Sequence, residues 1–141
     1  MKGKFFLDTN IFVYSFDARN EAKRLQAIKL IETAMSTQMG CVSYQVVQEF
    51  LNVAHKKFAQ AMSLNDCKRY LSRVFTTLCV VFSSISLYEK ALELSQRWQY
   101  SFYDSLIIAS ALSSGCKVLY TEDLHDGQII QDLEIENPFK G

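Results

Sequence analysis

Short apolar runs alternate along the chain with longer segments in which apolar residues recur at helical spacing. The apolar runs predict strands at residues 4–7, 41–42, 79–82 and 117–120, with an edge strand at residues 133–135. The segments between them predict helices at residues 10–16, 20–39, 45–59, 63–78, 86–98 and 103–114. Strands that alternate with helices in this way predict an α/β fold with a parallel sheet covered on both faces.

Local signals predict where several helices begin and end. Asn10 is predicted to be the N-cap of the first helix. Residues 63–66 and 86–89 both read Ser-x-x-acid and resemble capping boxes, which predicts that later helices start there. Gly40 and Gly115 follow helical segments and are predicted to end them.

Composition places the chain among ordinary globular proteins. Its 141 residues are 49% hydrophobic and 21% charged, which predicts a single domain over residues 1–141. The net charge is zero, and a neutral total decides nothing about nucleic acid because a basic rim can surround an acidic centre. Four dispersed cysteines argue against a zinc or disulfide framework. Without a leader or a membrane-length apolar run, we expect a soluble cytoplasmic protein.

Four carboxylates stand where strands or helices turn toward one edge of the predicted sheet. Asp8 and Asp123 follow two apolar strands, Asp104 opens a helix, and Glu49 lies one to two turns into another. Each acid alone has a structural explanation as a turn, loop, solvated helix or first-turn residue. Ligands of parallel sheets bind outside the carboxyl ends of strands, so the four together predict one shared site.

Convergence of these acids would require a cation. Two carboxylates about 4 Å apart repel by roughly 4 kcal/mol at an effective dielectric near 20. All-oxygen ligation without nearby His or Cys suits Mg²⁺ or Mn²⁺ rather than zinc, and such an ion activates water and neutralises a phosphodiester. Thr9, Asn10 and Thr121 adjoin the acids and are predicted to hydrogen-bond their oxygens, although capping alone would also explain Asn10.

The motifs that carry these residues resemble one known family. The segments LDTNIFVYSFD, VVQEFLN, FYDSLIIASAL, VLYTEDLHDGQ and ENPF together resemble the PIN domain, and within it the VapC-type toxins of bacterial toxin–antitoxin pairs. The match spans essentially the whole chain in the right order. The resemblance implies a three-layer α/β/α domain that cleaves RNA with Mg²⁺ or Mn²⁺.

The resemblance also implies residue roles and partners. Asp8, Glu49, Asp104 and Asp123 match the four family acids, and the supporting positions match Thr9, Asn10 and Thr121. Relatives commonly dimerise and are silenced by a small antitoxin. Many carry T-x-D-x-D-F after the fourth strand, whereas this chain has TEDLHDG, which leaves open an assisting role at the metal for Asp126 or Glu122.

Two other functions fit parts of the sequence. A phosphotransfer domain of the receiver or haloacid dehalogenase type would use Asp8, but the second acid two residues on and the expected late lysine are missing. A non-catalytic module that binds RNA or protein would have no reason to keep four mutually repelling acids. The nuclease interpretation therefore comes first.

Aromatic residues on the helices also predict a homodimer. A core of this size was expected to leave part of them uncovered, with contact through the helices around Glu49 and Cys67. The residues concerned are Phe50, Phe58, Tyr70, Phe75 and Trp98.

Overall fold

A computed structural model describes residues 3–58 and 60–140. The first half contains β1 (Phe5–Leu7), α1 (Thr9–Tyr14), α2 (Glu21–Thr37), β2 (Gly40–Ser43) and α3 (Tyr44–Lys56). The middle contains α4 (Leu64–Tyr70), a π-helical turn (Leu71–Phe75), α5 (Thr76–Leu78), β3 (Cys79–Val81) and α6 (Ile85–Trp98). The last part contains α7 (Phe102–Ser113), β4 (Val118–Tyr120), β5 (Ile129–Ile130) and β6 (Leu133–Glu136).

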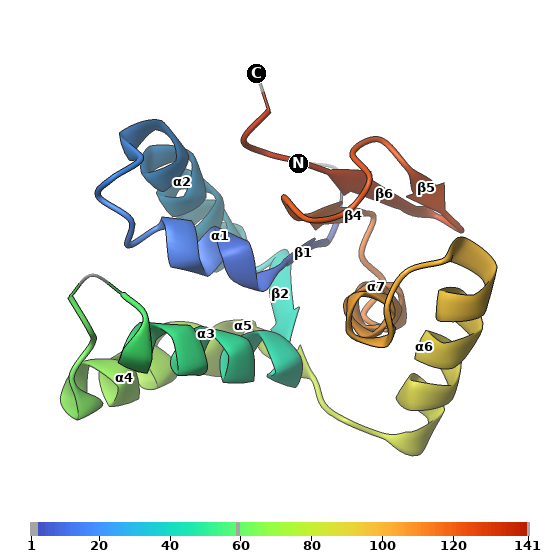
Figure 1. The fold of residues 1–141 in the computed structure, drawn as a ribbon, viewed down its shortest axis with the longest axis horizontal. Coiled ribbons are helices and arrows are strands. Elements are labelled where there is room, and N and C mark those ends of the chain that lie inside the picture. The colour runs from blue at the N-terminus through green and yellow to red at the C-terminus, as the bar shows by residue number, and fades with distance from the viewer. Residues whose placement is uncertain (1–2, 59, 141) are drawn as a thin grey trace.

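The sheet has six strands in the order β3-β2-β1-β4-β6-β5. Every neighbouring pair is parallel except β5 and β6, which confirms the predicted α/β class. The chain adds β2 and β3 on one side of β1 and then returns to add β4 on the other. Right-handed crossovers therefore place α1 to α5 on one face and α6 and α7 on the opposite face (Figure 1).

The core lies on both sides of β1. Phe5, Phe6 and Leu7 are all fully buried, as expected for a central parallel strand that is covered twice. Helix α7 is buried along most of its length, from Ser105 to Ala111. This helix packs against α6, and its C-terminal end leads directly into β4.

Two helix starts differ from the sequence prediction. Ser63 caps α4 as predicted, its hydroxyl accepting from the Asp66 N–H at 3.1 Å. The capping box at 86–89 is wrong, because Ser84 caps α6 by accepting from the Leu87 N–H at 3.1 Å. The N-cap of α1 is Asp8 rather than Asn10.

The C-terminal strands also differ from the prediction. Strand β6 is not the edge, because it pairs with both β4 and β5. The edge is β5, whose two residues were too short a run to be recognised from apolar periodicity. Gly115 follows α7 with φ +77°, consistent with the predicted helix end.

The aromatic residues behind the dimer prediction mostly belong to the core of the chain itself. Phe50 is fully buried, Phe75 is 2% exposed, and the Phe50 ring stacks on Tyr70 with centroids 5.0 Å apart. Phe50 and Phe75 therefore need no partner subunit to cover them, and the reason given for predicting a dimer is wrong for these rings. Exposed apolar side chains occur instead around the end of β3 and the start of α6, at Val80, Phe82 and Ile85.

Gly40 has a different role from the predicted helix end. The left-handed residue after α2 is Gln38 (φ 59°), whereas Gly40 starts β2 directly beneath that helix. A Cβ on Gly40 would lie 2.2 Å from Ala34 Cβ and 2.8 Å from Ala34 Cα. Glycine is needed here because the helix and the strand approach closely.

We expect Gly40→Ala to lower the free energy of unfolding by about 1–3 kcal/mol, because the added methyl overpacks this contact. Urea unfolding followed by circular dichroism measures the change. Adding Ala34→Gly to the same variant removes the nearest clashing atom and should restore part of the loss. Equal midpoints for Gly40→Ala and the parent protein would contradict this account.

Candidate functional site

The site begins at the carboxyl ends of β1 and β4. These strands are neighbours at the point where the chain reverses its direction of strand addition, which is where open α/β sheets bind ligands. Asp8 follows β1 and Thr121 follows β4. The Thr121 hydroxyl donates to Asp8 Oδ2 at 2.8 Å, and the Thr9 N–H donates to Asp8 Oδ1 at 2.7 Å.

Asp8 is a buried carboxyl group in a negative environment. The residue is 8% exposed, and its burial is the main reason that its pKa is raised to about 7. Hydrogen bonds from Thr121 and Thr9 lower this pKa, while the charges of Glu49 and Asp123 raise it further. The ionised form of Asp8 is therefore disfavoured unless positive charge is added.

Helix α3 carries Glu49 to the same place. The Thr9 hydroxyl donates to Glu49 Oε1 at 2.5 Å, which joins α1 to α3. Gln45 Nε2 donates to Glu49 Oε2 at 3.1 Å and to the Tyr103 carbonyl at 3.3 Å, which joins α3 to the start of α7. Gln45 was not predicted from the sequence as a site residue, although its i, i+4 spacing from Glu49 places it on the same helix face.

Helix α7 brings Asp104 to the carboxyl edge because it runs opposite to the strands. Its C-terminal end feeds the amino end of β4, so its first turn lies at the other edge of the sheet. Partial burial raises the pKa of Asp104, a hydrogen bond to Ser101 opposes this, and the charges of Asp123 and Glu49 raise it again. Asp104 thus lies in the same electric field as the other acids.

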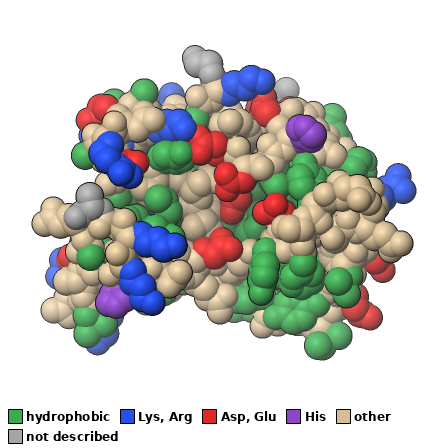
Figure 2. All heavy atoms as spheres, in the orientation of Figure 1, with side chains coloured by type: hydrophobic (Ala, Val, Ile, Leu, Met, Phe, Trp, Pro, Cys, Tyr) green, Lys and Arg blue, Asp and Glu red, His purple; other side chains and the backbone are tan. Residues whose placement is uncertain are grey.

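Asp123 completes the set from the loop after β4. Asn10 Nδ2 donates to Asp123 Oδ2 at 3.1 Å and to Thr121 Oγ1 at 3.3 Å. Thr121 in turn donates to Asp8, so Asn10 and Thr121 link Asp123 to Asp8 in one hydrogen-bond network, which Thr9 extends to Glu49. Figure 2 shows acidic side chains gathered near the middle of this face. Asp123 itself is exposed, so this end of the cluster is open to solvent.

Glu122 is engaged elsewhere. It forms an ion pair with Lys23 of α2 and accepts from the Tyr14 hydroxyl of α1 at 2.6 Å. Burial would raise the pKa of Glu122, but these two contacts outweigh burial and hold it below its usual value. Its backbone N–H also donates to Asn10 Oδ1 at 3.4 Å. Glu122 anchors the loop that carries Asp123, through contacts that sequence periodicity could not show.

Asp126 is also held away from the four acids. Its carboxylate accepts from the Asn137 N–H at 2.8 Å and from Lys140 Nζ at 3.2 Å. These contacts lower the pKa of Asp126. They fasten the loop to the C-terminal segment, and within the described residues they give no support to the predicted role of Asp126 at a metal.

We expect Tyr14→Phe to lower the free energy of unfolding by about 1 kcal/mol, because it deletes the hydrogen bond that the hydroxyl donates to Glu122 and the one that it accepts from Lys23. The ring contact with Phe139, with centroids 4.9 Å apart, should survive. Chemical denaturation measures the loss. Phe139→Leu, which removes a ring but no bond to Glu122, is the comparison. A Tyr14→Phe protein as stable as the parent would show that the hydrogen bond between Tyr14 and Glu122 does not stabilise the fold.

The donor set fits a hydrated hard cation better than a closed metal cage. Within residues 3–58 and 60–140, no three His, Cys, Asp or Glu side chains are placed to hold a metal by themselves. Mg²⁺ usually keeps several waters and binds through one or two carboxylates plus substrate phosphate. Among the described residues, three buried side-chain oxygens have no hydrogen-bond partner: Ser43 Oγ, Gln45 Oε1 and Ser105 Oγ. Because Gln45 also donates to Glu49, its free oxygen suits an ordered water next to this acid.

The chain belongs to the PIN domain family, whose profile matches residues 5–125. A comparison with curated protein sequences finds no match. The family typically uses divalent metal ions. In the part of the chain that the structure describes, no helix is long and apolar enough to cross a membrane.

Solved structures of toxins share the fold at low sequence identity. A toxin–antitoxin complex from Klebsiella pneumoniae has a TM-score of 0.68 at 19% identity, covering 96% of this chain and 98% of that one. Mycobacterium tuberculosis VapC20, a toxin that cleaves the sarcin–ricin loop, has a TM-score of 0.60 at 18% identity, covering 82% and 87%. FitAcB from Neisseria gonorrhoeae has a TM-score of 0.64 at 17% identity, covering 96% and 98%. At these identities the likeness concerns the fold.

Proposed function

We propose that this protein is an endoribonuclease that requires Mg²⁺ or Mn²⁺. The observation that carries the proposal is the hydrogen-bond network of Asp8, Glu49 and Asp123 at the switch point of the sheet, where burial raises the pKa of Asp8 to about 7 and the charges of Asp123 and Glu49 act on Asp104. Four acids in one field are costly to the fold unless a cation binds. A purely structural role would give no reason to place four acidic side chains near one another.

In this proposal the chain's own residues hold and orient a hydrated cation. Asp8 is fixed by Thr121 and the Thr9 N–H, and Glu49 is fixed by the Thr9 hydroxyl and Gln45. Asp8 must be ionised to bind a cation, so cation binding displaces a proton from Asp8 and strengthens as the pH rises through about 7. A bound Mg²⁺ or Mn²⁺ supplies charge neutralisation for the phosphodiester and a lowered pKa for water.

The comparisons support RNA as substrate and a toxin role. The fold matches VapC and FitB toxins, one of which is described as cleaving the sarcin–ricin loop. Several of the matched structures are complexes with an antitoxin. We propose accordingly that this protein is a cytoplasmic toxin, that it acts as a homodimer, and that a small antitoxin partner silences it.

Cleavage of total cellular RNA with and without metal tests the enzymatic proposal. The purified protein should cut RNA in Mg²⁺ or Mn²⁺, stop in excess chelator, and resume when metal is restored. Metal-independent cleavage would contradict the mechanism. RNA that is bound but never cut, under every metal condition, would favour the non-catalytic binding module.

A further inference from the structure

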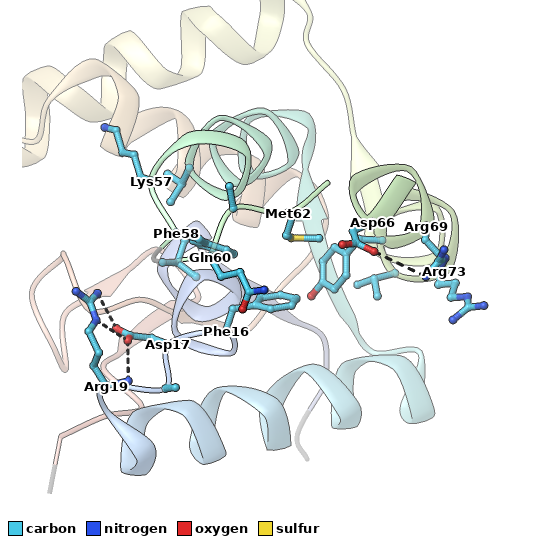
Figure 3. A pocket seen from close by; sticks show the side chains of 16 residues that line it. Phe16, Asp17, Arg19, Lys57, Phe58, Gln60, Met62, Asp66, Arg69 and Arg73 are labelled. Atoms are coloured by element: carbon cyan, nitrogen blue, oxygen red, sulfur yellow. Dashed lines mark hydrogen bonds and ion pairs between the residues drawn. The ribbon is translucent and has the colours of Figure 1, made fainter. Parts of the chain in front are cut away.

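A hollow of about 780 Å³ lies between the end of α1, the end of α3 and α4 with the π-helical turn (Figure 3). Its size is that of a small-molecule or nucleotide site, which spans about 300–1,000 Å³. We call it the lateral pocket. The residues that line it include Val13, Phe16, Val53, Lys57, Phe58 and Arg73.

Two residues that line the lateral pocket lie one helical turn from Thr9 and Glu49. Val13 follows Thr9 by four residues on α1, and Val53 follows Glu49 by four residues on α3, so each pair shares a helix face. Thr9 and Glu49 are themselves hydrogen-bonded. Four residues rise about 6 Å along a helix, a length comparable with one nucleotide of a strand.

An aromatic face is available inside this pocket. Phe16 is 43% exposed although its ring lies 5.5 Å from that of Phe58 and 5.4 Å from that of Tyr70, centroid to centroid. Figure 3 shows Phe16 and Phe58 in the middle of the hollow, near Met62. A ring supported from behind and open on its other side is a platform on which a nucleobase stacks.

Positive charge surrounds the same hollow in a chain whose net charge is zero. Arg19 pairs with Asp17, and Arg69 lies 3.8 Å from Asp66. Lys57 and Arg73 also line the hollow, and among the described residues no carboxylate forms a salt bridge with either. These two side chains are available to phosphates of a strand that enters the pocket.

We propose that the lateral pocket binds an unpaired nucleobase of the RNA substrate, next to the phosphate that is held at the acids. Phe16 stacks on the base, and Lys57 and Arg73 contact the flanking phosphates. The pocket thereby selects single-stranded or looped RNA, because a paired base cannot leave its stack to enter. This inference rests on the proposed ribonuclease function for the identity of the strand.

Binding of a labelled single-stranded RNA of about 10 nucleotides, within the site sizes of single-strand-binding folds, provides the first measurement. Fluorescence anisotropy in chelator separates binding from cleavage. Phe16→Leu should weaken binding about 5- to 20-fold, since stacking on a ring is lost while apolar volume is kept. Phe16→Tyr, which keeps the ring, should bind as the parent does. Melting temperatures of both variants establish that they are folded.

The two cations are expected to act differently from the ring. Lys57→Gln and Arg73→Gln should weaken binding to all sequences and each lower the slope of log K against log salt by about 0.7. Lys29→Gln, at an exposed position of α2, is the matched control and should change neither quantity. Slopes that stay at the parent value in both pocket variants would overturn the phosphate contacts.

A series of RNAs, each with one abasic nucleotide at a different position, tests whether the lateral pocket binds a base. One position should weaken binding to the parent about 5- to 20-fold, and Phe16→Leu should not respond to that position. If every position gives the same affinity, or if Phe16→Leu responds like the parent, the base subsite is overturned.

Two further outcomes keep this inference distinct from the proposed function. Cleavage that is metal-dependent but indifferent to Phe16→Leu retains the nuclease and removes the subsite. Ring-dependent RNA binding without any cleavage retains the subsite and removes the nuclease. An acidic amphipathic Leu/Glu helical peptide is the third probe. If it binds in a Phe16-dependent manner while RNA binding does not depend on Phe16, the pocket docks protein and the inference fails.

Discussion

Replacing Asp104 by Asn should reduce the rate of RNA cleavage by at least about 10²–10³-fold, the effect of losing one electrostatic contact to a transition state. The amide nearly preserves the side-chain volume but removes a negative charge that a cation needs. Asp104 lies in the first turn of α7, and its pKa is raised by burial and by the charges of Asp123 and Glu49. Its substitution therefore acts on the site and not on the core.

The same variant should be slightly more stable than the parent in chelator, because one of four repelling charges is gone. Single-turnover cleavage with saturating Mg²⁺ measures the rate, and thermal unfolding in chelator measures stability. Asp132→Asn, in the turn between β5 and β6, is the control and should leave both unchanged. An Asp104→Asn enzyme that cuts as fast as the parent would refute the assignment.

The sequence predicted the site best where strand ends decide the position. Parallel strands present their carboxyl ends at one edge, so Asp8 after β1 and Thr121 after β4 had to be close once those strands were neighbours. Asp104 followed from the same geometry, because a helix that precedes a parallel strand starts at that edge. The order of strands and helices along the chain determines at which edge of the sheet a residue lies, and the apolar pattern predicts that order.

Contacts between elements distant in sequence could not be predicted in this way. The Lys23–Glu122 ion pair joins residues 99 positions apart, and the helical periodicity around Lys23 gives no sign of a partner in the loop after β4. Gly40 had the appearance of a helix end, but the close packing of Ala34 against β2 explains it. Phe50 and Phe75 belong to the aromatic residues that the core was predicted to cover incompletely, because the amphipathic pattern does not say how many neighbours will cover a ring.

Asp8→Asn should flatten the pH dependence of stability between pH 5 and pH 8 in metal-free protein, because it removes the contribution of the Asp8 carboxyl group. The folded pKa of Asp8 is about 7, against 3.8 for the unfolded chain, so the folded state binds the proton more tightly. Stability contributed by protonated Asp8 is then full below the unfolded pKa and is lost as the pH rises through about 7. A shift of this size corresponds to a change of up to about 4 kcal/mol.

Urea unfolding of parent and variant at a series of pH values, all in chelator, isolates this contribution. The parent should lose stability from pH 5 to pH 8 and regain it at pH 8 when Mg²⁺ is added, because a bound cation keeps ionised Asp8 favourable. The Asn variant should show a flatter profile and a weaker response to Mg²⁺. Raised pKa values of Asp104 and Glu136 add dependence of the same sign in both proteins, so the difference between the profiles is the quantity to compare. Parallel profiles would show that Asp8 is ionised in the folded protein without a cation, and the electrostatic argument for the metal site would fail with it.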